Sequence, residues 1–243
     1  MASVRLLPHQ LLLSLFLFLN LFAPAWAADH EPSPIETLDR LKTGNKHFAE
    51  GKLDHPRTSP TIRKELANGQ KPDAIVLSCS DSRVPPELLF EKGLGELFVV
   101  RVAGNVLGSA TVASIEYAAE HLGSRLIIIM GHESCGAIKT ALNQPRGKPT
   151  GSFDLDSLIS TIQGNLDAQG SGARTLAAED KSLRKPAMAN VDSVAADLVK
   201  RSKLIRELAA SGKVRIVRAI YGLESGKVDF WDAPEAGVPY SAP

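Results

Sequence analysis

The stretch AIVLSCSDSR, residues 74–83, joins an apolar run to a polar segment that carries a cysteine, an aspartate and an arginine. Residues 74–77 are apolar at every position and follow Pro72, a pattern typical of a strand that is buried on both faces. Such strands belong to parallel sheets covered by helices, so this stretch predicts an α/β fold. Further strands of this kind are expected at 97–100, 126–130 and 214–217.

Helical patterns alternate with these strands. Ser33 and Pro34 offer an N-cap and a first-turn proline to a helix that extends to about Gly51. Further helices are expected at 61–68, before Gly69, at 109–121, and at 192–210, before Gly212. Residues 147–186 are the least orderly stretch, with only a weak helix at 155–166.

The alternation of strands and helices predicts one α/β domain over residues 28–243, in which helices flank a mostly parallel central sheet. The first part of this domain, residues 28–60, is expected to form an N-terminal helical arm that is available to a partner subunit.

Composition excludes several classes of protein. The 243 residues include 28 Lys and Arg against 27 Asp and Glu, and a net charge of +1 gives no field that would attract nucleic acid. Two cysteines in so long a chain exclude a disulfide scaffold. Charged residues make up only 23% of the chain and apolar runs recur, which excludes disorder.

The first 27 residues have the pattern of a signal peptide. Arg5 is followed by an apolar run at 11–22, which is too short to span a bilayer, and Ala25 and Ala27 supply the small residues of a cleavage site. An uncleaved membrane anchor is the alternative interpretation. We expect cleavage before Ala28 and export to the periplasm or the outside of the cell, with no stable membrane insertion.

The two cysteines and one histidine follow the predicted strands. In an oxidising compartment a disulfide between Cys79 and Cys135 is the default. However, Cys79 follows the first strand, while His132 and Cys135 follow the third, at the edge of a parallel sheet where functional groups collect. Zinc accepts thiolate and imidazole ligands, and three protein ligands leave a fourth position for water. We therefore expect a zinc site, since a disulfide would leave Asp81 and Arg83 unexplained.

Two motifs together resemble the β-class carbonic anhydrases, here as an exported bacterial-type member. They are CSDSRV at 79–84 and GHESCG at 131–136, and the resemblance extends to LKTGN at 41–45, FVVRVAGN at 98–105 and GLESGKV at 222–228. It implies the β-carbonic anhydrase fold, one zinc ion per chain held by Cys79, His132 and Cys135, and reversible hydration of carbon dioxide to bicarbonate and a proton through zinc-bound hydroxide.

The resemblance also implies roles for other residues. Asp81 and Arg83 match a catalytic pair beside the metal, in which Arg83 keeps Asp81 ionised and away from the metal; without that pairing Asp81 is a candidate fourth ligand in a closed form. The substrate-binding positions of the family, which lie across a dimer interface, match Gln70, Phe98, Ala103, Gly104 and Tyr117. His121 matches a residue proposed to transfer protons, although a structural role on its helix is the simpler interpretation. A homodimer or a higher even oligomer is implied.

Two alternatives to carbon dioxide hydration remain open from the sequence. A hydrolase of the same fold could act on carbon disulfide or carbonyl sulfide, and only access to the pocket would distinguish it. A non-catalytic protein would use the cysteines for a structural zinc or a disulfide, and a structural zinc normally has four protein ligands.

Overall fold

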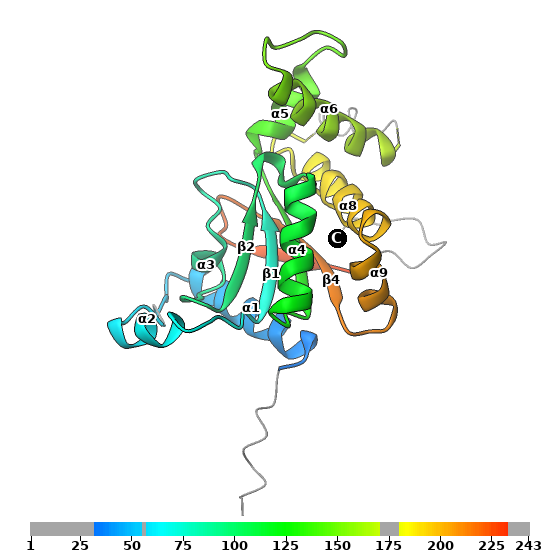
Figure 1. Cartoon of the computed structure of the whole chain (residues 1–243). Helices are drawn as coiled ribbons and strands as arrows, with labels where there is room; N and C mark the ends of the chain where they lie inside the picture. The colour runs from blue at the N-terminus through cyan, green and yellow to red at the C-terminus, as the bar shows by residue number, and fades with distance from the viewer. Residues whose placement is uncertain (1–31, 55–56, 171–179, 233–243) are drawn as a thin grey trace, which may run out of the picture. The chain divides into compact units, whose positions relative to one another are not determined.

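The structure is a computed structural model that describes residues 32–54, 57–170 and 180–232 (Figure 1). The expected signal peptide, residues 1–27, lies outside the described residues. A five-stranded sheet with the order β2-β1-β3-β4-β5 forms the centre. Its strands are β1 (Ala74–Ser78), β2 (Leu97–Arg101), β3 (Leu126–His132), β4 (Arg215–Tyr221) and β5 (Val228–Trp231). The first four are parallel and β5 is antiparallel to β4, so the predicted mostly parallel sheet is confirmed.

Helices cover both faces of this sheet. On one face lie α4 (Ser109–His121), α8 (Arg184–Arg201) and α9 (Lys203–Ala210), and on the other lie α1 (Pro34–Ala49) and α3 (Pro86–Leu89). The helices α5 (Gly136–Asn143) and α6 (Phe153–Ala168) lie beyond the carboxyl ends of the strands (Figure 1). A short helix, α2 (Pro60–Leu66), and a 3₁₀ turn, η1 (Ala103–Asn105), complete the described elements. No helix in the described ranges is both long and apolar enough to cross a membrane.

The two core layers follow from the alternation of side chains along the strands. Ile75 and Ile127 point toward α4 and α8, while Val76 and Ile128 point toward α1 and α3, and all four are fully buried. Burying a side chain of this size contributes about 1.5–3 kcal/mol. Burial on both faces therefore explains the apolar runs of β1 and β3. The same expectation is wrong for β2, which lies at the edge of the sheet and is only partly buried, and β4 is fully buried only after its first two residues.

The N-terminal helix α1 packs on the core of its own chain. Ser33 is its N-cap, as the sequence predicts, and the structure adds a capping box with Glu36. Asn45 anchors its last turns, since the side chain donates to the carbonyls of Leu89 and Gly226. In contrast, α2 buries no side chain. Contact between this arm and a partner subunit stays a prediction.

The single helix predicted over 192–210 is wrong in its bounds. The helix α8 begins at Arg184, eight residues earlier, and ends before Ser202, whose hydroxyl accepts a hydrogen bond from the backbone N–H of Ile205 (3.0 Å) and so starts α9. The weak helix expected at 155–166 is confirmed as α6, which is 16 residues long. The start of α8 was missed because the helix buries three polar residues, Asn190, Asp192 and Ser193, which interrupt its apolar pattern.

Candidate metal centre

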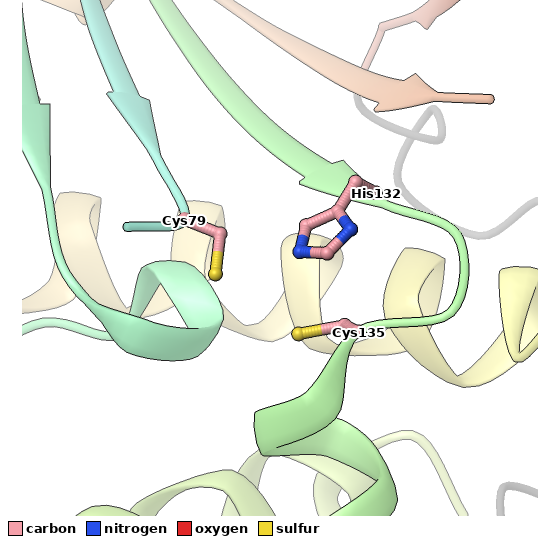
Figure 2. A group of neighbouring side chains, drawn as sticks. All are labelled: Cys79, His132 and Cys135. Atoms are coloured by element: carbon pink, nitrogen blue, oxygen red, sulfur yellow. The ribbon is translucent and has the colours of Figure 1, made fainter. Parts of the chain in front are cut away.

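Three side chains meet at the carboxyl edge of the sheet. Cys79 directly follows β1, His132 is the last residue of β3, and Cys135 is the N-cap of α5. Because β1 and β3 are parallel neighbours, paired at Ser78 and Met130, their ends deliver Cys79 and His132 to the same place. One ligand atom from each residue lies within 4.8 Å of the other two, and Figure 2 shows the side chains turned toward a shared space.

The histidine is prepared as a ligand. The Nδ1 of His132 donates to the carbonyl of Glu133 (2.8 Å), which leaves the lone pair on Nε2. His132 is fully buried, and its Nε2 has no hydrogen-bond partner among the described residues. A buried polar atom without a partner costs about 1–3 kcal/mol. A metal ion would satisfy this atom, and two sulfurs with one imidazole nitrogen are a donor set typical of zinc.

Both cysteines are buried and free, so the structure contains no disulfide between them. A hydrogen bond from the thiol of Cys135 lowers the pKa of Cys79 well below that of a free thiol. The same hydrogen bond, together with burial, raises the pKa of Cys135. Without metal the pair therefore holds one proton between two sulfurs, and metal binding would release it. In addition, the backbone N–H of Gly104 donates to the Sγ of Cys79 (3.3 Å).

Asp81 and Arg83 form a two-bond pair beside this group. Nε of Arg83 donates to Oδ1 of Asp81 (2.9 Å) and Nη2 donates to Oδ2 (2.7 Å). These bonds hold the pKa of Asp81 well below its usual range. The Oδ2 of Asp81 also lies 3.8 Å from the Nε2 of His132. The carboxylate is thus ionised and next to the position where the three ligand side chains converge.

Arg101 contributes to the site although the sequence analysis did not single it out. It is the last residue of β2, and its guanidinium donates to the carbonyl oxygens of Cys79 (3.1 Å) and Asp81 (2.6 Å). These bonds fix the segment that carries both residues. Its position at the carboxyl end of a strand, on the same edge as Cys79, is the signal that would have found it.

The turn between His132 and Cys135 is supported from the start of α8. Ser134 has a positive φ of 51°, and its N–H donates to the carbonyl of Ser182 (2.6 Å). Arg184 donates to the carboxylate of Glu133 (3.0 Å) and also binds Asp229. No periodic pattern predicts these contacts, because they join segments that are about 50 residues apart.

The predicted substrate-binding residues divide into two groups. Gly104 is buried and contacts Cys79, and Ala103 precedes it in η1. Gln70, however, precedes β1 whereas Cys79 follows it, and a strand of this length spans about 17 Å. Phe98 is near the start of β2 and packs near Tyr117, which in turn packs near His121 (ring centroids 6.3 and 5.3 Å apart).

Gln70, Tyr117 and His121 are exposed, with Tyr117 49% accessible. Within one chain these residues do not join the group formed by the two cysteines and His132. A second copy of the chain would be needed to bring them near it.

Comparisons with known proteins agree with this fold. Residues 74–228 match the sequence model of the family described as carbonic anhydrase. A relative named carbonic anhydrase 2, from Mycobacterium tuberculosis, is 38% identical over 196 residues, which cover 80% of this chain and 91% of the relative. The β-carbonic anhydrase structure from Aspergillus fumigatus has a TM-score of 0.64 at 26% identity, covering 79% of this chain and 89% of that one.

A second solved structure is the Coccomyxa β-carbonic anhydrase in complex with acetazolamide. Its TM-score is 0.61 at 25% identity, and the match covers 79% of this chain and 85% of that one. The fold is thus shared with a class of enzymes. The chain belongs to the β-class carbonic anhydrases.

Proposed function

We propose that this chain hydrates carbon dioxide reversibly to bicarbonate and a proton, at one zinc ion held by Cys79, His132 and Cys135. Membership of the carbonic anhydrase family supports the assignment of this reaction. The observation that carries the site is the buried, unpartnered Nε2 of His132 beside two free cysteine sulfurs. A zinc ion bound there would supply a nucleophile at neutral pH, because a metal ion makes water far more acidic than it is in bulk solvent.

Asp81 and Arg83 are the proposed catalytic pair. The carboxylate of Asp81 is ionised and can accept a hydrogen bond from the attacking nucleophile, which orients the nucleophile toward the carbon. Arg83 holds both oxygens of that carboxylate, so it fixes the direction in which Asp81 accepts.

The same contacts support a closed form of the site. Oδ2 of Asp81 lies 3.8 Å from Nε2 of His132, so a small rotation would bring the carboxylate into the ligand group as a fourth member. Arg83 competes for the same oxygen. In the structure Arg83 holds Asp81, which favours the open form.

A second copy of the chain would complete the substrate pocket. Gln70, Phe98 and Tyr117 lie at the opposite end of the strands from Cys79, and β2, which carries Phe98, is an edge strand of the described sheet. We therefore propose a homodimer or a higher even oligomer, in which these residues, with Ala103 and Gly104, contact substrate. His121 beside Tyr117 is a candidate for proton transfer in the same interface.

Export is a further part of the proposal. Residues 1–27 have the order of a signal peptide, with Arg5, an apolar run and a cleavage pattern that ends at Ala27. The mature chain would then act in the periplasm or outside the cell. N-terminal sequencing of protein recovered from the periplasmic or culture fraction tests this, and a mature N-terminus at Ala28 is expected.

Zinc titration into metal-free protein tests the reaction. We expect hydration of carbon dioxide to increase with added zinc and to reach its maximum at about one ion per chain, the stoichiometry of a single three-ligand site. Saturable binding of zinc without hydration would contradict the proposal, and turnover of carbonyl sulfide by the same samples would then indicate the sulfur-substrate alternative.

A further inference from the structure

A buried asparagine is linked to Cys79 through the backbone of Gly104. Asn190, on α8, is fully buried, and its Nδ2 donates to the carbonyl of Gly104 (2.9 Å). Its Oδ1 accepts a hydrogen bond from Nδ2 of Asn165, on α6 (2.9 Å). Both ends of the amide are thus engaged, so two helices fix its orientation.

Gly104 is the residue that this amide holds. It has a left-handed φ of 65°, which a glycine adopts without cost, and a Cβ at this position would lie 2.8 Å from the Cδ1 of Ile162. A glycine supplies little conformational restraint of its own. The orientation of its two peptide groups therefore depends on their hydrogen bonds.

Those two peptide groups point to different partners. The carbonyl of Gly104 accepts from Asn190, and its N–H donates to Sγ of Cys79 (3.3 Å). The peptide group that carries this carbonyl has one further anchor, since the N–H of Asn105 donates to the carbonyl of Val102 (2.8 Å). Loss of the Asn190 contact would remove one of the two anchors, so that the backbone could tilt at Gly104 and turn its N–H away from the sulfur. A hydrogen bond to a thiolate withdraws electron density from it, and such outer contacts tune the bond between sulfur and metal.

We infer that Asn190 is a positioning residue for the metal centre: by holding the Gly104 carbonyl, it aims the Gly104 N–H at Cys79 and so sets the donor strength of that sulfur. This inference rests on the proposed function, because it takes Cys79 as a metal ligand. It assigns to α8 and α6 a role that goes beyond packing.

Asn190→Ala tests the inference by two measurements that do not depend on catalysis. Zinc affinity is measured by competition with a chromophoric chelator, and the sulfur-to-metal charge-transfer band is measured in protein loaded with cobalt(II). We expect zinc affinity to fall about tenfold, within the range found for outer contacts of metal ligands, because the Cys79 side chain is no longer held in place before the metal binds, and this loss outweighs the stronger donation of the freed sulfur. We also expect the cobalt band to move to longer wavelength, because the sulfur electrons are held less tightly without the hydrogen bond.

Ser193→Ala is the matched control. Ser193 is buried on the same helix, and its hydroxyl links α8 to α6 by donating to the carbonyl of Asn165 (2.6 Å), without contact to Gly104. This variant should lose stability but keep the wild-type cobalt band. Should Asn190→Ala fail to fold, Asn165→Ala replaces it, with a smaller shift of the band in the same direction.

The outcomes separate the two proposals. Wild-type protein that binds neither zinc nor cobalt contradicts the proposed function and this inference with it. Wild-type protein that binds both, with an Asn190→Ala or Asn165→Ala variant whose band and affinity match those of Ser193→Ala, contradicts this inference alone.

Discussion

Arg83 donates to both carboxylate oxygens of Asp81, from Nε at 2.9 Å and from Nη2 at 2.7 Å. Only a planar guanidinium can make this two-bond contact, and it fixes the rotation of the carboxylate as well as its charge. The pair lies beside the two cysteines and His132, so the direction in which Asp81 accepts a hydrogen bond depends on Arg83.

Substitution of Arg83 should therefore reduce turnover without removing the metal. We expect Arg83→Ala to lower kcat/KM for carbon dioxide hydration by about 10- to 100-fold, the usual effect of losing an outer-shell partner, with zinc content unchanged. Arg83→Lys should also be impaired, since lysine keeps the positive charge but cannot donate two parallel hydrogen bonds to the carboxylate. Arg215→Ala, which breaks the two-bond contact to Asp232 at the other end of the sheet, serves as the control. Wild-type turnover in Arg83→Ala would refute the proposed pair.

Arg184 should support metal binding through Glu133. The carbonyl of Glu133 accepts from His132, and its carboxylate is held by Arg184, so loss of Arg184 loosens the turn that carries the ligand. We expect Arg184→Ala to weaken zinc binding about tenfold in a chelator competition. Asp229→Ala removes the other partner of Arg184 and leaves Glu133 in place. Equal zinc affinities in the two variants would show that the turn does not need this contact.

Asp180 should give the protein a stability that depends on pH. Burial raises its pKa, but hydrogen bonds from the Ser182 hydroxyl and from the backbone of Ser182 and Lys185 outweigh burial, and the pKa is lowered overall. A carboxyl whose pKa is lower in the folded state stabilises the protein above its unfolded pKa of about 3.9, and this contribution is lost as the pH falls through the folded pKa.

Asp180→Asn should accordingly be less stable than the wild type at pH 7, by about 1 kcal/mol, and the difference should shrink below about pH 4. Urea unfolding at pH 7, 5 and 3 measures it. The control is Asp39→Asn, an exposed carboxylate on α1 that lies 3.8 Å from Lys42. A stability difference that stays constant with pH would contradict the assignment.

Removal of the metal under air should produce a disulfide between Cys79 and Cys135. Both are free thiols whose sulfurs lie within 4.8 Å, and the lowered pKa of Cys79 supplies a thiolate. A count of free thiols in denatured protein is expected to give none after metal-free oxidation and two after refolding with zinc. Two thiols in both samples would mean that the geometry does not allow the bond.

The sequence predicted the parts of the fold that have simple periodic patterns. The helix at 109–121 is correct at both ends, and the predicted strands begin or end within a few residues of the observed ones. A continuous apolar run indicates a strand in the interior of a sheet, and this pattern can be recognised within one short segment of sequence. The antiparallel β5 and the eight-residue α5 were not predicted, because short elements carry little periodic signal.

The candidate site was predicted to the extent that its residues follow strands directly. The two cysteines and His132 lie at strand ends or just beyond them, and the parallel order of β1 and β3 brings them together. Asn190 and Arg184 were missed because they lie on α8, far along the sequence from Gly104 and Glu133, which they contact only in the folded chain. Gln70 and Tyr117 lie away from the two cysteines within one chain, so their contact with substrate stays a prediction that no pattern within one chain specifies.

Zinc content and the rate of carbon dioxide hydration, measured on the same purified protein across pH and beside a Cys135→Ser variant, test the central claim most directly. The account predicts about one zinc per chain with hydration in the wild type, and loss of both in the variant. Wild-type protein with bound zinc but no hydration, or a variant that hydrates carbon dioxide at the wild-type rate, would contradict it.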